Sequence, residues 1–394
     1  MNMRFFITVL AVIVLFSENG VASNVGKRYP SEKHVIVDRV TGRMITVLTS
    51  SQFNDVKASY SRRHSWTADG NWIVFQSERG NNGRQIFAVN ESTGDIVQLT
   101  DDNNALTGRF CLSSKDMKMF YLREQQGERQ AIEMNIGRLI DDSMSDQVKE
   151  PAVYERVVVS LSQNYGQLTL DADETYLYWG GDINGLSEIY KINIVTGKID
   201  KILDVDFQIG HLQANPWTTG EMFFCKETGG DADQRIWSIR ADGTNFRPIY
   251  VETPDEWVTH ETVTGPDEMM FIISGNNILL REKPTGIAVV HLRTHQVRLL
   301  GEAYEKIPGD GKRTGGFWHC NGSPDMRWAI GDTHFGNIIL INRATGEQIL
   351  LSAGHPMCPD HAHPIFSPDS KRVLIQSALL TEGKNLNLMV VNVP

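Results

Sequence analysis

The sequence predicts an all-β protein folded as one seven-bladed β-propeller, and the first observation behind this prediction is an internal repeat. A unit of strand, Pro-Asp or Asp-Gly turn, strand, polar loop, strand, Thr-Gly turn and strand recurs with a period of roughly fifty residues. Its first turn falls at Asp69, Asp116, Asp173, Gly220, Asp267, Asp325 and Asp369. The stretches between the strands lack helical periodicity, which disfavours a parallel α/β fold.

The two ends of the repeat predict how the ring closes. The last copy ends after its third strand, at Val393 and Pro394, whereas the segment HVIVDRVTGRMITVLT near the N-terminus has no first strands of its own. We therefore expect residues 34–49 to complete the seventh blade, which closes the ring and covers an exposed sheet edge.

The first 23 residues read as a secretory signal peptide. Arg4 precedes the apolar run FFITVLAVIVLF, and Val21 and Ser23 supply small residues before the expected cleavage point. This run is too short to span a bilayer, and no later segment is long and apolar enough to do so. The sequence thus predicts an exported, periplasmic protein whose single catalytic propeller domain covers residues 24–394, with no membrane span after signal removal.

Composition narrows the class of partner. The chain has 394 residues, 41% of them hydrophobic, and a formal net charge of −10. No basic stripe is present to release counterions from phosphates, which argues against nucleic acid as a partner. Four cysteines are too few to form a disulfide scaffold in a chain of this length.

Propeller topology assigns a face to each loop. Residues just before each first strand share one face with the loops between the second and third strands, so we expect both sets to meet at one mouth of the channel. The positions before first strands include His64, Tyr165, His211, His260, His319, His361 and His363. The matching loops add Arg79, Arg84, Asp182, Lys226, Arg235, Asp332 and His334.

The histidines nearest the C-terminus have the character of a metal site. His361 and His363 form an H-x-H pair, and His319 precedes the first strand of the neighbouring blade. Three imidazoles suit a divalent transition metal such as Mn, Fe, Ni or Zn. Hydrolysis by a metal-bound water and neutralisation of a substrate carboxylate are both open to such a site. A G-x-S-x-G nucleophile motif is absent from the sequence.

Several segments resemble the oligogalacturonate lyases, which are seven-bladed polysaccharide lyases of pectin breakdown. The resemblance runs from about Arg62 to the C-terminus. The segments that carry it are THE at 259–261, RIWSIRADGTNFR at 235–247, WHCNGSPDMRWAIGD at 318–332, HAHPIFSPD at 361–369 and QIGHLQANP around His211.

The resemblance implies a β-elimination on a uronate glycan. Manganese or a similar ion, held by His319, His361 and His363, would bind the uronate carboxylate, and a base would remove the C5 proton to leave a 4,5-unsaturated sugar. His260 is the expected base, and Arg235 is expected to hold substrate charge or to assist the base. The remaining substrate-binding candidates are His211, Lys226, Arg79, Arg84, His64 and His334.

Three departures from the family pattern leave alternatives open. Cys358 stands where the family has a glutamine, so it is either a further metal ligand or a disulfide partner of Cys320. Lys226 replaces a histidine in the family's C-H-E segment. The export signal differs from the family's usual cytoplasmic location, which admits another uronate polymer such as ulvan or a rhamnogalacturonan. A non-catalytic periplasmic propeller of the TolB type and a metal-dependent hydrolase are the competing classes.

Overall fold

Short antiparallel strands make up almost all of the regular structure of this chain. The computed structural model describes residues 23–50, 52–57, 64–80, 82–102, 105–125, 127–161, 165–183, 186–229, 232–275, 285–303, 305–306 and 314–394. The predicted signal peptide, apart from Ser23, lies outside the described residues. Among those residues, no helix is both long and apolar enough to cross a membrane.

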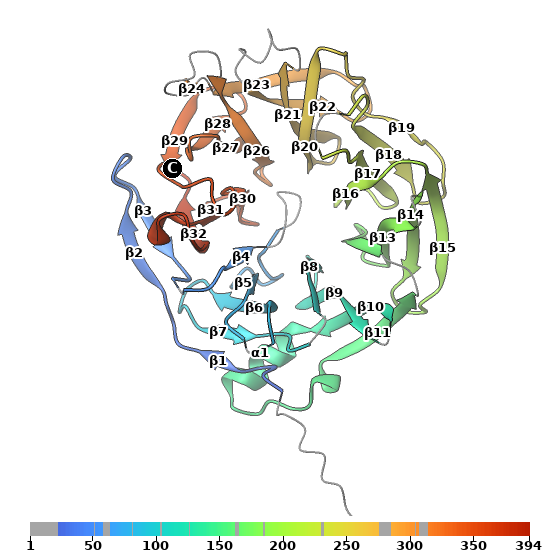
Figure 1. The fold of residues 1–394 in the computed structure, drawn as a ribbon, viewed down its shortest axis with the longest axis vertical. Coiled ribbons are helices and arrows are strands. Elements are labelled where there is room, and N and C mark those ends of the chain that lie inside the picture. Colours follow the sequence, from blue (N-terminus) through green and yellow to red (C-terminus); the bar gives the residue numbers. More distant parts are fainter. Residues whose placement is uncertain are drawn as a thin grey trace, which may run out of the picture.

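Seven sheets stand around a central channel like the blades of a propeller (Figure 1). Each sheet runs outward from an innermost strand, which is β4, β8, β12, β16, β20, β26 or β30 in chain order. Every pair of neighbouring strands within a sheet is antiparallel, as the repeat predicts. The predicted seven-bladed propeller is confirmed.

The first four blades follow one another along the chain. Blade one contains β4 (Val56–Lys57), β5 (Trp72–Ser77), β6 (Gln85–Asn90) and β7 (Ile96–Gln98), with β1 (Arg28–Tyr29) at its outer edge. Blade two contains β8 (Ala105–Leu112), β9 (Lys118–Gln125), β10 (Glu128–Asn135) and β11 (Glu155–Leu161). Blade three contains β12 (Tyr165–Leu170), β13 (Tyr176–Ile183), β14 (Leu186–Asn193) and β15 (Ile199–Val205). Blade four contains β16 (Ile209–Ala214), β17 (Glu221–Lys226), β18 (Ile236–Arg240) and β19 (Arg247–Pro248).

The last three blades complete the ring. Blade five contains β20 (Glu256–Gly265), β21 (Glu268–Gly275), β22 (Thr285–His291) and β23 (Val297–Ala303). Blade six contains β26 (Phe317–Gly322), β27 (Trp328–Thr333), β28 (Ile338–Asn342) and β29 (Gln348–Ser352). Blade seven contains β30 (Ile365–Phe366), β31 (Arg372–Ser377), β32 (Asn387–Asn392), β3 (Met44–Val47) and β2 (His34–Val37). Outside the blades lie α1 (Ile136–Met144), the 3-10 turns η1 (Pro151–Val153) and η3 (Leu379–Thr381), and the pair β24 (Glu305–Lys306) and β25 (Thr314–Gly315).

The Thr-Gly turns join third and fourth strands by one recurring device. In blade three the side chain of Asn193 accepts hydrogen bonds from the backbone N–H of Val195 and Thr196, and Gly197 follows with φ +70°. Asn342 organises the same turn in blade six. An Asx turn ending in a left-handed residue favours glycine there, which is why the sequence repeats Thr-Gly. Blade five places His295 at this position instead, with φ +58°.

The N-terminal segment closes the ring as the sequence predicts. Strand β3 pairs with β32, with Ile45 opposite Val391, and β2 adds a further strand outside it. The turn between β2 and β3 is fixed to blade six, because Asp38 accepts hydrogen bonds from Ser352 Oγ (2.7 Å) and from the backbone N–H of Ala353 (2.8 Å). Residues 34–49 therefore hold blades six and seven together.

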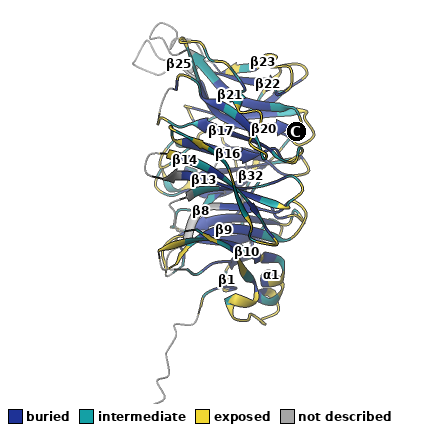
Figure 2. Cartoon of the chain, turned by 90° about the vertical axis from the view of Figure 1, so that its right-hand side faces the viewer, coloured by how far each residue is buried: buried dark blue, intermediate teal, exposed yellow. Residues whose placement is uncertain are grey.

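The core consists of apolar faces packed between neighbouring blades, and most strand residues are buried while the rims are exposed (Figure 2). Polar side chains on innermost strands tie blade three to blade four, blade four to blade five, and blade six to blade seven. Gln167 accepts from Leu212 N–H at 2.6 Å, Gln213 from Val263 N–H at 2.9 Å, and Asn321 from Phe366 N–H at 3.4 Å. These bonds satisfy backbone donors at irregular points of the innermost strands and fix the spacing of the blades.

Candidate active site

Histidines from four adjacent blades occupy irregular positions on or beside the innermost strands. His211 in β16, His260 in β20 and His363 before β30 have φ values of +52°, +54° and +46°. In β16 and β20 the pairing register shifts across these residues, which is the mark of a β-bulge. Bulges re-aim side chains, and strained backbone of this kind gathers at functional sites.

This placement corrects one part of the sequence interpretation. His211, His260 and His319 lie within their innermost strands, not before them, although His361 and His363 do precede β30. The reason is that each strand continues past its bulge toward the mouth. Strand alternation also fails to explain the H-x-H pair, since His361 and His363 lie outside a strand and their rings stand 6.3 Å apart at 75°.

The rings of His260, His319, His361 and His363 form one group, which we call the histidine cluster. His319 lies at its centre, with ring centroids 4.2 Å from His260, 5.2 Å from His361 and 3.7 Å from His363. Trp318 covers one side, 4.7 Å from His260 and 5.6 Å from His361. Three blades thus bring four imidazoles together, as the sequence predicts in outline.

Asp332 on β27 holds this cluster in place. The residue is fully buried, and its carboxylate accepts hydrogen bonds from the backbone N–H of His319 (2.7 Å) and of His363 (3.0 Å). His319 Nδ1 lies 3.1 Å from both carboxylate oxygens. Although burial alone would raise the pKa of Asp332, the charge and hydrogen bond of His319 hold that pKa well below its usual range. Asp332 is therefore ionised and fixes the orientation of the His319 ring.

The donor set fits a divalent metal. Ligand atoms of His319, Asp332 and His361 all lie within 4.8 Å of one another. His361 Nδ1 is buried and has no hydrogen-bond partner among the described residues. Because the Asp332 oxygens are already engaged by His319 and His363, we read Asp332 as the carboxylate that orients a histidine ligand, an arrangement common around metals.

His363 and Cys358 depart from the predicted ligand set to different degrees. His363 stays beside His319, but its Nε2 lies 3.3 Å from Asp360 Oδ1. Burial would raise the pKa of Asp360, yet the hydrogen bond and charge of His363 lower it to about 2. Cys358 is exposed and belongs to neither group of ligand atoms that the structure brings together.

The Cys320–Cys358 disulfide alternative is wrong in this structure. All four cysteines, which lie within the described part of the chain, are free. Cys320 is fully buried, and its Sγ lies 3.6 Å from the backbone oxygen of His260 in blade five. It therefore points away from blade seven, where Cys358 lies.

His260 has the environment of a neutral imidazole. It is only 5% exposed, and burial, followed by the charges of His319 and His211, lowers its pKa well below the usual value. A neutral ring can accept a proton at neutral pH, which is what a general base needs.

Arg235 belongs to a second, ion-paired group beside the cluster. Its Nε donates to Glu261 Oε2 at 3.1 Å, and its Nη2 lies 3.6 Å from Glu227 Oε2. Glu261, fully buried next to His260, also accepts from His211 Nδ1 at 2.7 Å. Burial would raise the pKa of Glu261, but His211 and Arg235 hold it well below its usual range.

Two residues near the cluster, the buried Lys57 and the half-exposed Asp360, escaped the sequence analysis. Lys57 on β4 is 1% exposed, and its Nζ has no hydrogen-bond partner among the described residues. Burial lowers the pKa of Lys57 to about 7, and the carboxylates of Asp360 and Asp332 oppose that shift. Asp360 likewise carried no recognisable motif. Only the folded ring shows that Lys57 lies near the carboxylates of Asp332 and Asp360, and that Asp360 lies beside His363.

Two of the predicted substrate-binding residues lie near the site, and two others are held in ion pairs in blade one. His334 is exposed beside the cluster, with its ring 4.9 Å from Trp318, and Lys226 pairs with Asp233 at 2.6 Å next to Arg235. Arg79, by contrast, is buried in an ion pair with Asp55 at 2.6 Å, and Arg84 pairs with Glu78 at 3.0 Å.

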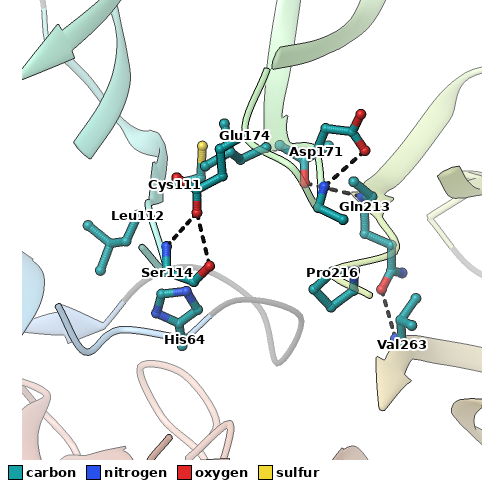
Figure 3. A pocket seen from close by; sticks show the side chains of 13 residues that line it. His64, Cys111, Leu112, Ser114, Asp171, Glu174, Gln213, Pro216 and Val263 are labelled. Carbon is teal, nitrogen blue, oxygen red and sulfur yellow. Dashed lines mark hydrogen bonds between the residues drawn. The ribbon is translucent and has the colours of Figure 1, made fainter. Parts of the chain in front are cut away.

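His64 lies away from the histidine cluster. It lines a cavity with Ser114 and Glu174, which belong to turns between first and second strands (Figure 3). The prediction that His64 shares the face of the other histidines is wrong. The innermost strand of blade one begins with β4, before His64, so His64 lies further along the chain, beside the turns that join first and second strands.

A family model described as oligogalacturonate lyase matches residues 23–276. The chain belongs to the oligogalacturonate lyase family. The matched range includes His211, Arg235 and His260 but ends before His319, so the metal role of the cluster rests on its geometry. The predicted family resemblance is confirmed.

Curated relatives carry the same family description, and two solved structures share the fold. An oligogalacturonide lyase of Pectobacterium atrosepticum is 26% identical over 49% of this chain and 53% of its own length. An oligogalacturonate lyase of Dickeya dadantii is 22% identical over 89% of this chain and 94% of its own. An oligogalacturonate lyase solved in complex with manganese is 20% identical, with a TM-score of 0.77 over 94% of this chain and 98% of its own. A solved oligogalacturonate lyase from Vibrio parahaemolyticus is 18% identical, with a TM-score of 0.75 over 94% of this chain and 99% of its own.

Proposed function

We propose that this protein is a metal-dependent lyase that cleaves oligogalacturonate or a closely related uronate glycan by β-elimination. The observation that carries the proposal is the contact of the buried imidazole of His260 with a group of residues able to hold a divalent metal. Membership of the oligogalacturonate lyase family gives the reaction class. A non-catalytic propeller has no need of this buried, strained arrangement.

His319 and His361, with His363 beside them, would hold the metal, and Mn²⁺ is our choice because a structure of similar fold contains manganese. A metal bound there would neutralise the uronate carboxylate and so favour loss of the neighbouring C5 proton. Asp332 keeps the His319 ring in one orientation through its contact with Nδ1, and this leaves the opposite ring nitrogen as the ligand atom.

The other steps belong to side chains of the chain itself. His260 would accept the C5 proton, because its lowered pKa keeps the imidazole neutral. Arg235 keeps its charge at every working pH, and its position beside His211 and Glu261 suits the neutralisation of substrate charge. Trp318 packs against both His260 and His361 and would limit the access of water to them.

Residues 1–23 carry the features of a signal peptide, and we propose export to the periplasm on that basis. Immunodetection in fractionated cells tests this proposal. A mature chain that begins near Asn24 in the periplasmic fraction is expected, and a full-length chain confined to the cytoplasm would contradict it.

The reaction class is tested by mixing the purified protein and Mn²⁺ with a panel of uronate glycans. We expect ultraviolet absorbance from a conjugated, 4,5-unsaturated product to rise with oligogalacturonate. New reducing ends without that absorbance would identify a hydrolase. Absorbance only with another polymer, such as ulvan or a rhamnogalacturonan, would change the substrate and keep the mechanism.

A further inference from the structure

We propose that His211, held by Glu261, donates the proton to the leaving oxygen of the cleaved bond. This inference rests on the proposed lyase function and deepens it. Elimination needs two proton transfers, since the C5 proton must be accepted and the departing O4 must gain one. His260 is suited to the first transfer, and a second buried histidine with a different environment stands on the adjacent blade.

The pair of His211 and Glu261 has the geometry of a carboxylate–histidine dyad. Glu261 Oε1 lies 2.7 Å from His211 Nδ1, and both residues are buried. Since the Glu261 carboxylate is ionised, it can only accept, so Nδ1 carries a hydrogen. An ionised carboxylate at this distance stabilises the protonated ring and fixes its orientation, so Nε2, which lies 3.7 Å from Glu227 Oε2, is the atom that would hold the transferable proton.

His211 and His260 lie at equivalent irregular points of two adjacent blades. Both occupy β-bulges with left-handed backbone, His211 in β16 of blade four and His260 in β20 of blade five. Gln213 locks these strands together, because it accepts from Val263 N–H at 2.9 Å and donates to the backbone oxygen of Glu261 at 3.3 Å. The strands β16 and β20 thus place His211 beside the carboxylate of Glu261 and His260 beside the ring of His319.

His211, Cys225 and Glu227 also have ligand atoms within 4.8 Å of one another, which raises the alternative of a second metal site. The surrounding charge disfavours it. Arg235 Nη2 lies 3.5 Å from His211 Nδ1 and 3.6 Å from Glu227 Oε2, so a guanidinium already supplies positive charge to this group. A divalent cation there would stand against a buried arginine, whereas a singly charged imidazolium is balanced by the carboxylates of Glu261 and Glu227.

The proposed step balances without any further reactant. The C5–H bond breaks and its proton passes to His260, while its electron pair forms the C4–C5 double bond. The C4–O4 bond breaks, and the leaving oxygen keeps that electron pair and takes the Nε2 proton of His211. The products are a 4,5-unsaturated uronide and a shortened glycan with a hydroxyl group, and proton exchange with water resets both histidines.

The test compares two leaving groups in the wild type, His211→Asn and His260→Asn. Asparagine tolerates left-handed backbone, so both substitutions suit their φ values. One substrate is oligogalacturonate, and the other is a galacturonide carrying a 4-nitrophenyl ether at O4, which departs as a stable anion without protonation. His295→Asn is the matched control, because His295 also has a positive φ and lies in an exposed turn of blade five.

We expect His211→Asn to lose about 100- to 10,000-fold in kcat on oligogalacturonate and to keep most of its rate on the nitrophenyl ether. His260→Asn should lose activity on both substrates, and His295→Asn on neither. Equal losses of His211→Asn on both substrates, or a change in KM alone, would overturn the proton-donor role. A wild type that forms no unsaturated product from either substrate would refute the lyase function itself. If His211→Asn does not fold, His211→Gln, whose amide can donate to Glu261, replaces it.

Discussion

Replacing Asp332 by asparagine should weaken metal binding more than it weakens the fold. The carboxylate serves three donors at once, namely His319 N–H, His319 Nδ1 and His363 N–H. An amide of the same shape offers a single oxygen, so one donor must face the NH₂ group. Losing a carboxylate that orients a metal-bound histidine costs about 10- to 100-fold in metal affinity, or about 1.4 to 2.7 kcal/mol. The unsatisfied buried donor adds about 1 to 3 kcal/mol of lost stability.

Calorimetric titration of the metal-free protein with Mn²⁺ measures the first effect, and urea unfolding measures the second. Asp171→Asn is a matched control, because Asp171 is also buried and accepts from Ala172 N–H, Gly220 N–H and Tyr178 Oη. It should lose similar stability with unchanged Mn²⁺ affinity. If Asp332→Asn binds Mn²⁺ as tightly as the wild type, the reading of Asp332 as the residue that orients His319 is wrong.

Two further substitutions probe other parts of the site. His260→Asn should reduce kcat/KM by about 100- to 10,000-fold with unchanged Mn²⁺ content, and retention of more than about a third of wild-type activity would exclude His260 as the base. Lys57→Met should stabilise the metal-free protein by about 4 kcal/mol at pH 7. The pKa of Lys57 is about 7 in the folded protein and 10.5 ordinarily. Between pH 7 and pH 10.5 the unfolded chain therefore binds more protons than the folded chain, so the stability of the wild type rises with pH in this range. The advantage of Lys57→Met should therefore shrink as urea unfolding is repeated at higher pH, and an advantage that is independent of pH would show that the buried amine is not the cause.

The fold could be predicted because its determinants are local and repeated. Blades one, three and six carry the same Asx and Thr-Gly turn chemistry, and the unfinished last copy required a strand from elsewhere, which β3 supplies. The export signal and the periplasmic location remain predictions. The bulges were not predictable, because the left-handed backbone at His211 and His260 comes from pairing across the sheet and leaves no glycine in the sequence.

The site could be predicted only in part, because burial decides what each charged residue does. Arg79 and Arg235 occupy equivalent loops in the sequence, yet Arg79 is held by Asp55 while Arg235 is held beside the histidine cluster by Glu261. Replacing Arg235 by alanine should therefore destabilise the fold as well as lower activity, because Arg235 is paired with the buried Glu261. Removing Arg235 leaves a fully buried carboxylate with one partner fewer, at a cost of about 3 kcal/mol or more.

The central claim is that the bond breaks by elimination and not by addition of water. Digestion of oligogalacturonate in water enriched in heavy oxygen, with Mn²⁺ present, tests this claim directly by mass spectrometry. The account predicts a product without the label, lighter by one water than the corresponding hydrolysis product, and formed only by metal-loaded protein. A saturated product that carries the heavy oxygen would contradict it.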